Sequence, residues 1–382
     1  MMRTTGRIAV LAVLALTGAF LLLWATNGGR RNAASAQSVS PATTRTYYIA
    51  ADEVDWDYAP ARRNLIAGRP FNDDETVFVG QGPSRIGSTY KKALFRQYTD
   101  ASFTRPQPKD SRWEHTGLLG PTIRAEVGDT IKVVFKNNAT RPYGIHAHGV
   151  RYAKSSEGAL YNDGTSGADK ADDAVPPGRT FTYTWEVPQR SGPAEHDGQS
   201  VMWMYHSHTD EIKDTNAGLM GPMIIYPNGA LRDDGSVVGI DREFVAVLSV
   251  MNENESHYLQ DNIDRFAGDP ASVNPADPDF QESNLMHSIN GYVYGNGPMM
   301  VANAGERVRW YLMGMGTEVD LHTPHFHGNT VTSMGMRTDV LELLPASMKT
   351  ADMTPDAPGT WLLHCHVNDH IAAGMSTRYR IR

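Results

Sequence analysis

Short apolar runs, each about as long as a β-strand, follow one another along most of the chain. They are rich in valine, isoleucine, tyrosine and threonine, and glycine, proline, asparagine and aspartate separate them. The clearest runs cover residues 130–136, 180–187, 244–250 and 307–312. Because no long stretch keeps the periodicity of a helix, the pattern predicts an all-β protein built from sandwich or barrel domains.

The pattern repeats once along the chain. A Gly-Pro pair followed by a further glycine opens residues 130–136, and the same arrangement opens residues 307–312. Each copy then carries a His-x-His-Gly motif and ends on a second His-x-His motif. We therefore predict two related domains, at residues 37–229 and 241–382, joined by a linker at residues 230–240.

The first 36 residues differ from the rest. A basic start at Arg3 and Arg7 precedes an apolar run over residues 8–24, and a polar stretch then ends on Ala34-Ser35-Ala36. This arrangement is typical of an export segment. Residues 1–36 are thus predicted to be a cleaved signal peptide or, in the alternative, a membrane anchor. Both alternatives place the folded part outside the cytoplasm, in the periplasm, at the cell surface or outside the cell.

Charge and cysteine content narrow the chemistry. The 382-residue chain has 35 basic and 43 acidic residues, a net charge of −8, which disfavours nucleic acid as a partner and favours small substrates or metal ions. Cys365 is the one cysteine, so the chain forms no internal disulfide despite the predicted oxidising compartment. The cysteine needs another explanation.

Ten of the fourteen histidines fall in four short clusters, and each cluster contains one His-x-His pair. Side chains alternate along a strand, so both histidines of a pair point to the same side. Eight imidazoles are too many for one tetrahedral zinc ion, and such a site is too poor in oxygen for calcium or magnesium. Convergence of the four pairs therefore predicts a copper cluster.

The same alternation turns Cys365 to the face opposite its neighbours His364 and His366. With His370 and Met375 shortly after it and His322 from the preceding histidine cluster, the thiolate completes the ligand set of a blue-copper site. Its sulfur is joined through the backbone to the flanking histidines. The sequence thus predicts a one-electron site connected to a cluster that reduces a multi-electron acceptor.

These motifs resemble those of the multicopper oxidases. The surrounding sequence is similar to ceruloplasmin and hephaestin, and the arrangement is similar to that of the two-domain small laccases. The segments that carry the resemblance are residues 47–60 (YYIAADEVDWDYAP), 118–126 (LLGPTIRAE), 205–210 (YHSHTD), 313–328 (MGMGTEVDLHTPHFHG) and 361–375 (WLLHCHVNDHIAAGM).

The resemblance implies two cupredoxin-like Greek-key sandwiches and a reaction that couples four one-electron oxidations to reduction of dioxygen to water. It also implies the copper ligands. The type 1 ligands would be His322, Cys365, His370 and Met375; the type 2 ligands His146 and His325; the type 3 ligands His148, His206, His208, His327, His364 and His366.

The first copy departs from this pattern. Ser207 stands where the second copy has Cys365, Ile212 lies five residues after the serine, and Leu219 takes the place of Met375. We expect one type 1 site per chain and a half-share of clusters. A homotrimer with clusters between subunits would complete them; a cluster formed within one chain is the alternative.

For the electron donor, the resemblance implies an iron site at Glu282, His287 and Asp369, with Glu318 offered by a neighbouring domain, and so a ferroxidase-like reaction. In the alternative these acidic residues are ordinary surface, and Asp369 orients His370. Laccase-like oxidation of phenols is the second prediction. Cuprous ion is the third, because four methionines lie between the two parts of the type 1 site. They are Met334, Met336, Met348 and Met353, which are otherwise packing residues.

Asp169, Asp172 and Asp173, near Lys154, resemble the calcium loop of ceruloplasmin and are otherwise a solvated loop. Two other classes of protein fit the sequence less well. A copper nitrite reductase has a single type 2 copper and carries its cysteine in the first domain, whereas here the cysteine lies in the second. A non-enzymatic copper-binding scaffold does not need the intact ligand set.

Overall fold

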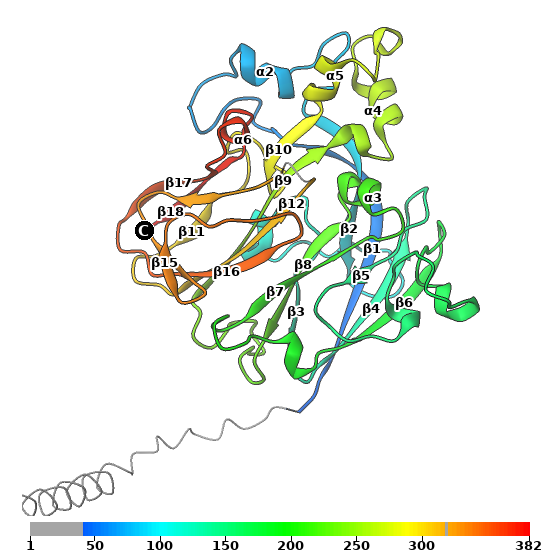
Figure 1. The fold of residues 1–382 in the computed structure, drawn as a ribbon, viewed down its shortest axis with the longest axis vertical. Coiled ribbons are helices and arrows are strands. Elements are labelled where there is room, and N and C mark those ends of the chain that lie inside the picture. The colour runs from blue at the N-terminus through cyan, green and yellow to red at the C-terminus, as the bar shows by residue number, and fades with distance from the viewer. Residues whose placement is uncertain (1–40, 318–319) are drawn as a thin grey trace, which may run out of the picture. The chain divides into compact units, whose positions relative to one another are not determined.

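A computed structural model describes residues 41–317 and 320–382, and residues 40–382 form one compact unit (Figure 1). The predicted export segment at residues 1–36 and the predicted iron ligand Glu318 lie outside the described residues. Among the residues described, no helix combines the length and the apolar character needed to cross a membrane.

The first half of the chain folds as two four-stranded sheets. One sheet has the order β2-β1-β4-β6, from β1 (Thr44–Asp57), β2 (Thr89–Tyr98), β4 (Thr130–Asn137) and β6 (Thr180–Glu186). The other has the order β3-β8-β7-β5, from β3 (Ile123–Glu126), β5 (His146–Ala147), β7 (Val201–His206) and β8 (Met220–Tyr226). A core that includes Phe95, Phe135 and Trp185 lies between the sheets.

The second half repeats this plan with a larger first sheet. That sheet has the order β10-β9-β12-β16-β14-β15, from β9 (Arg242–Asn252), β10 (Leu285–Ile289), β12 (Val308–Met315), β14 (Val331–Ser333), β15 (Met336–Thr338) and β16 (Met348–Met353). The other has the order β11-β18-β17-β13, from β11 (Met300–Ala302), β13 (Pro324–Phe326), β17 (Gly359–Cys365) and β18 (Ser376–Ile381).

The strand pairing confirms the predicted all-β fold of two sandwiches. Each half has a parallel pair in the same place: β1 beside β4 in the first half and β9 beside β12 in the second. The apolar runs predicted as strands lie in β4, β6, β9 and β12. In β4 every second side chain is buried, because one face of its sheet covers the core.

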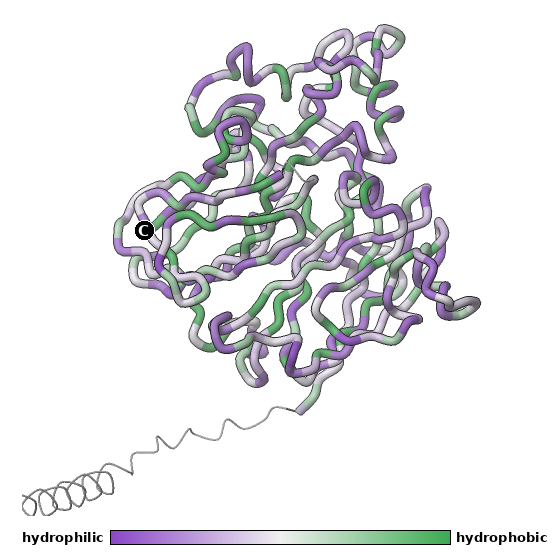
Figure 2. The backbone as a smooth tube through the Cα atoms, in the orientation of Figure 1, coloured by the Kyte–Doolittle hydropathy of each residue, from purple (hydrophilic) through white to green (hydrophobic). Residues whose placement is uncertain are grey.

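The α-helices among the described residues are short and lie in the connections. They are α2 (Asp73–Val79), α3 (Glu211–Ala217), α4 (Leu259–Phe266), α5 (Pro278–Ser283) and α6 (Asn368–Ala372). Although α2 belongs to the first half in sequence, it contacts α5 of the second half (Figure 1). Figure 2 shows apolar positions along the strands and mostly hydrophilic positions in the outer loops.

The two halves share a third core. It is rich in methionine, with Met202 and Met204 from the first half packed in the same buried cluster as Met251 and Met313 from the second. A fully buried ion pair, Lys92 with Glu253, also joins the halves. Breaking either connection would expose apolar surface or leave a buried charge unpaired. The two sandwiches are therefore held in one arrangement.

Candidate metal centres

Cys365 lies at the centre of a buried group of metal-binding side chains. It ends β17, and ligand atoms of Cys365, His322 and His370 all lie within 4.8 Å of one another. The Cys365 sulfur is 3.6 Å from Nδ1 of His370, and the backbone N–H of Thr323 donates to this sulfur at 3.4 Å. The distances bring together three of the four residues predicted for the type 1 site.

Met375 is the fourth residue and is held beside the others by its backbone. The N–H of Cys365 donates to the Met375 carbonyl at 3.0 Å, and the N–H of Met375 donates to the His370 carbonyl at 2.9 Å. The Met375 side chain is completely buried. These hydrogen bonds place α6 and the start of β18 against the end of β17.

The free nitrogen of His322 tests whether this group fits a metal ion. Its Nε2 lies 3.0 Å from the Met315 carbonyl oxygen, whereas Nδ1 is buried and has no hydrogen-bond partner among the described residues. A buried imidazole nitrogen without a partner costs free energy, which a metal ion bound there would offset. Burial also lowers the pKa of both His322 and His370, which favours the neutral, ligating form. Two imidazoles, a thiolate and a thioether are the donors that suit copper.

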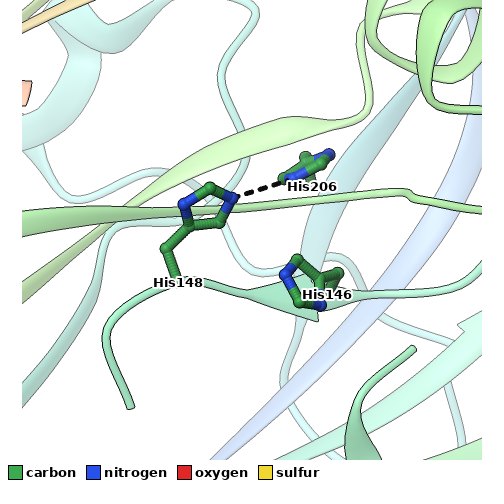
Figure 3. A group of neighbouring side chains, drawn as sticks. All are labelled: His146, His148 and His206. Carbon is green, nitrogen blue, oxygen red and sulfur yellow. Dashed lines mark hydrogen bonds between the residues drawn. The ribbon is translucent and has the colours of Figure 1, made fainter. Parts of the chain in front are cut away.

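The His-x-His pairs form two further groups, one in each half. In the first half, ligand atoms of His146, His148 and His206 lie within 4.8 Å of one another (Figure 3). Nε2 of His148 lies 3.1 Å from Nε2 of His206, and the ring centroids of His146 and His208 are 5.3 Å apart. All four imidazoles of the two motifs therefore meet at one edge of the sandwich.

The second half repeats this geometry. His325, His327 and His364 have ligand atoms within 4.8 Å, and Nε2 of His327 lies 3.0 Å from Nε2 of His364. The rings of His325 and His366 are 5.3 Å apart. The strand register is also the same in both halves. His146 is paired with His206 across β5 and β7, and His325 is paired with His364 across β13 and β17.

The glycine of each His-x-His-Gly motif has a steric role. Gly149 and Gly328 have φ angles of +75° and +69°, a region that side chains rarely adopt. A Cβ atom at Gly149 would lie 2.2 Å from Trp203, and one at Gly328 would lie 2.5 Å from Trp361. The indole ring therefore packs directly on the backbone that follows the histidines.

Burial keeps two of the first-half histidines, His148 and His206, neutral. The pKa of His206 is lowered to about 3 and that of His148 to about 4, mainly by burial and also by the neighbouring imidazoles. At neutral pH both imidazoles are therefore uncharged, and each has one unprotonated nitrogen available to a metal ion.

The two histidine groups remain separate within the chain. Across the described residues, every ring contact and hydrogen bond between two of these eight histidines joins members of the same half. Within the described part of the chain, the four imidazoles of each half therefore form a group of their own.

Two multicopper oxidase family models match the chain, over residues 97–230 and 267–382, and together they cover more than half of it. The chain belongs to the multicopper oxidase family. Membership implies copper as the cofactor, in agreement with the donor atoms of the three groups.

Curated relatives support this assignment. The chain is 48% identical over 341 residues to the ferroxidase HEPHL1 of Homo sapiens, covering 88% of the chain and 29% of the relative. It is 43% identical over 344 residues to human ceruloplasmin, covering 88% of the chain and 30% of the relative. The chain thus spans about a third of the length of the curated relatives it matches.

Solved structures agree on the fold. The multicopper oxidase mgLAC superposes with a TM-score of 0.57 at 17% identity, covering 89% of this chain and 86% of that one. Copper nitrite reductase from Nitrosomonas europaea superposes with a TM-score of 0.54 at 18% identity, covering 89% and 94%. At such identities the likeness concerns the fold alone.

In this multicopper oxidase, the first half has no thiolate at the place of Cys365. The N–H of Ser207 donates to the Leu219 carbonyl, and the N–H of Leu219 donates to the Asp214 carbonyl. These bonds match those of Cys365, Met375 and His370, so Asp214 is the counterpart of His370. The sequence had placed Ile212 there. That assignment was wrong because α3 is two residues longer than α6, and Ile212 is 63% exposed.

Three of the four residues predicted to bind iron lie around one cavity of about 470 Å³. His287 is buried on β10, and its ring centroid is 5.3 Å from that of His370. Glu282 on α5 and Asp369 on α6 are exposed and also line the cavity. The structure therefore brings together the three predicted iron ligands that it describes, directly beside the Cys365 group.

His287 has the tautomer and the neutral charge that a metal ligand needs. Its Nδ1 lies 3.0 Å from the Leu285 carbonyl oxygen, which makes Nδ1 the protonated nitrogen and leaves the lone pair on Nε2. Its pKa is lowered to about 4, mainly by burial and also by the neighbouring His370. The imidazole is therefore neutral at neutral pH.

Among the lining residues that sequence reasoning missed are Asp74 and Phe78. Both lie on α2, from the first half of the chain. The capping box formed by Asn72 and Glu75 signals a helix at this position, but no local pattern relates that helix to residues more than 200 positions later.

The three aspartates of the predicted calcium loop do not share one environment. Asp172 and Asp173 are buried, whereas Asp169 is exposed. Asp172 accepts a hydrogen bond from the Gly158 N–H through Oδ2, and its Oδ1 is buried without a partner among the described residues. Lys170 forms an ion pair with Asp173 at 3.0 Å.

The four methionines considered for cuprous ion also differ in environment. Met353 is buried in the second-half core, and Met348 is partly buried against the shared core. Met334 and Met336, at the β14–β15 hairpin, are 63% and 68% exposed. Packing accounts for the first two.

Proposed function

We propose that this multicopper oxidase takes electrons one at a time from ferrous ion and uses them to reduce dioxygen to water. The observation that carries the proposal is the cavity beside the Cys365 group, where Glu282, His287 and Asp369 meet and His287 contacts His370. Carboxylates with one imidazole suit iron, and they stabilise the ferric ion more than the ferrous ion.

The copper ligands that we propose include all members of the three groups. The proposed type 1 ligands are His322, Cys365, His370 and Met375; the type 2 ligands are His146 and His325; the type 3 ligands are His148, His206, His208, His327, His364 and His366. When bound, copper would supply one-electron chemistry at the first group and dioxygen reduction at the histidine cluster.

The chain itself supplies the path between the two kinds of site. Cys365 is bonded through the backbone to His364 and His366, so one continuous covalent path joins its sulfur to the cluster imidazoles. The N–H of Thr323 supports the negative charge of the thiolate. On the donor side, contact between the His287 and His370 rings brings the iron ligands next to the type 1 ligands.

We further propose that the clusters form between subunits of a homotrimer. The support is that the two histidine groups of one chain have no contact with each other among the described residues. Head-to-tail contacts that close into a ring would bring the first half of one chain against the second half of the next. Glu318 of a neighbouring subunit would then complete the iron site.

Two smaller assignments are also proposals. The unpartnered Asp172 Oδ1 supports a calcium ion bound by Asp172 and Asp173, with Asp169 at its edge. The second is that residues 1–36 direct export of the protein, and its support is the sequence pattern.

Oxidation of phenols is the second candidate function, because a cavity of about 470 Å³ has room for an aromatic ring. Dioxygen consumption by the copper-loaded protein, measured side by side with ferrous ion, cuprous ion and a phenol, separates the candidates. The ferroxidase proposal requires the highest kcat/KM with ferrous ion.

The variant Glu282→Ala tests the iron site itself. We expect kcat/KM for ferrous ion to fall about tenfold, while that for the phenol changes less than about twofold, since the phenol does not need a carboxylate ligand. Asp279→Ala is the matched control, an exposed carboxylate on the same helix that does not line the cavity. Equal losses with both donors would overturn the proposal.

A further inference from the structure

Helix α2 forms one wall of the proposed iron cavity. Its residues Asp74 and Phe78 are four positions apart, so both side chains lie on one face of the helix, and both line the cavity. The other lining residues named so far, Glu282, His287 and Asp369, belong to the second half. The cavity is thus built from both halves of the chain.

Phe78 contacts the innermost iron ligand. Its ring centroid is 5.6 Å from that of His287 with an interplanar angle of 76°, an edge-to-face contact. The same side chain packs against the core that the two halves share. Moving the ring away from His287 would disturb that packing, so the ring covers part of the imidazole in a fixed position.

The wall is rigid because a buried carboxylate holds its base. Glu75 accepts hydrogen bonds from the Asn64 side chain at 2.7 Å, from Arg69 at 2.8 Å and from the Asn72 backbone N–H at 2.9 Å. Only 7% of its surface is exposed. Charge-assisted bonds of this kind fix the start of α2 and the loop before it.

Three further contacts attach this segment to the second half. The N–H of Leu65 donates to the Tyr294 carbonyl at 3.0 Å, the N–H of Ala61 donates to the Asn296 side chain at 2.9 Å, and the rings of Phe71 and Tyr294 are 5.4 Å apart. Helix α2 is therefore a fixed part of the cavity.

We infer that α2 selects the electron donor: Phe78 restricts the approach of planar aromatic donors to His287, and Asp74 adds a carboxylate that attracts a divalent cation. This inference rests on the proposed function, because it concerns the same cavity. The volume of about 470 Å³ would admit a phenol, so exclusion depends on the ring that covers His287.

The negative charge at the mouth of the cavity also favours ferrous ion over a phenol. Asp74, Glu282 and Asp369 are all exposed acidic residues on the rim. They concentrate divalent cations near His287 and give no such advantage to a neutral phenol. Because exposed charges are screened, the advantage falls as ionic strength rises.

Substitution of Phe78 tests the steric part. In Phe78→Ala we expect kcat/KM for 2,6-dimethoxyphenol to rise at least fivefold, with a change below about threefold for ferrous ion. Val77→Ala on the same helix is the control, since this residue does not line the cavity. Phe78→Leu keeps an apolar contact with the shared core and should give a smaller rise of about twofold. An unchanged ratio of the two donors in the folded variants would overturn the inference.

Asp74→Asn tests the charge and is compared with Asp73→Asn, which changes an exposed carboxylate outside the cavity. We expect KM for ferrous ion to rise about three- to tenfold at low salt, with kcat nearly unchanged. Calorimetric titration of the oxidised, copper-loaded protein with Co²⁺ should show the same weakening in Asp74→Asn and none in Asp73→Asn. Equal affinities in the two variants would remove Asp74 from the site.

The two proposals fail in different ways. If the unsubstituted protein does not oxidise ferrous ion, the proposed function is wrong. If it does, and Glu282→Ala loses this activity while the Phe78 and Asp74 variants behave like their controls, the iron site stands and the role of α2 is wrong.

Discussion

The two halves of the chain share a backbone arrangement around Ser207 and around Cys365 but fill it differently. In both halves a backbone N–H donates to this side chain. The N–H of Gly144 donates to the Ser207 hydroxyl oxygen, and the N–H of Thr323 donates to the Cys365 sulfur. The residues that correspond are Tyr143 and His322, Ser207 and Cys365, Asp214 and His370, and Leu219 and Met375.

The polar groups of the first-half site satisfy one another. The Ser207 hydroxyl donates to Asp214 at 2.7 Å, Asp214 also lies 3.0 Å from Nε2 of His257, and the hydroxyls of Tyr143 and Tyr258 are 3.0 Å apart. In the second half, Nδ1 of His322 has no partner among the described residues. The comparison teaches that the scaffold alone does not make a metal site; a site needs donor atoms that the protein leaves free.

Cys365→Ser, which gives the second half the residue of the first, should have the largest effect. Without the thiolate we expect the intense sulfur-to-copper absorption to disappear and ferrous turnover to fall at least about 1,000-fold, or about 4 kcal/mol. Absorption spectra and dioxygen uptake measure both. Ser207→Cys is the matched variant and should show no second blue band, since Asp214 and Tyr143 offer no imidazole. A retained blue band in Cys365→Ser would contradict the type 1 assignment.

Replacing both His206 and His208 with alanine should have the next largest effect. Dioxygen consumption should fall at least about 100-fold, about 2.7 kcal/mol, while the blue absorption remains, because these residues belong only to the histidine group of the first half. His196→Ala, at an exposed histidine of the same half, is the control. Normal turnover in the double variant would rule out a cluster shared between the halves.

Asp214→Ala tests whether Asp214, and not Ile212, is the first-half counterpart of His370. Asp214 is fully buried, and its loss leaves Ser207 and His257 without their partner, so we expect the free energy of unfolding to fall by about 2–3 kcal/mol. Ile212→Ala, at an exposed position of the same helix, should change it by less than about 0.5 kcal/mol. Denaturant titration of the copper-free protein measures both. Similar losses in the two variants would contradict the placement of Asp214.

The pH dependence of stability should show the smallest effect. Burial lowers the pKa of His206 from 6.5 to about 3, so between these values the unfolded chain binds a proton that the folded chain does not. The copper-free protein should therefore lose stability as the pH falls below 6.5, by about 1.4 kcal/mol per pH unit for each such histidine. Denaturant titrations at pH 7.5, 6 and 5 should show a shallower slope for His206→Asn. Parallel curves for the two proteins would contradict the buried, neutral state of His206.

Local patterns in the sequence determined much of this protein. Strand-length apolar runs predicted the two sandwiches, and side-chain alternation placed the histidines of each pair on one face of a strand. Spacing also identified His322, Cys365 and His370, which the structure brings within 4.8 Å. These features could be predicted because they depend on the geometry of one strand or of one short connection.

Tertiary structure decided what depends on contacts between distant segments. Because α3 has two residues more than α6, the counterpart of His370 in the first half is Asp214. Counting residues from Ser207 had assigned this place to Ile212. Helix α2 reached His287 because its loop binds Tyr294, more than 200 residues further along. Sequence spacing does not encode such packing, since it depends on how the two sandwiches meet. The same packing leaves the two histidine groups of one chain apart.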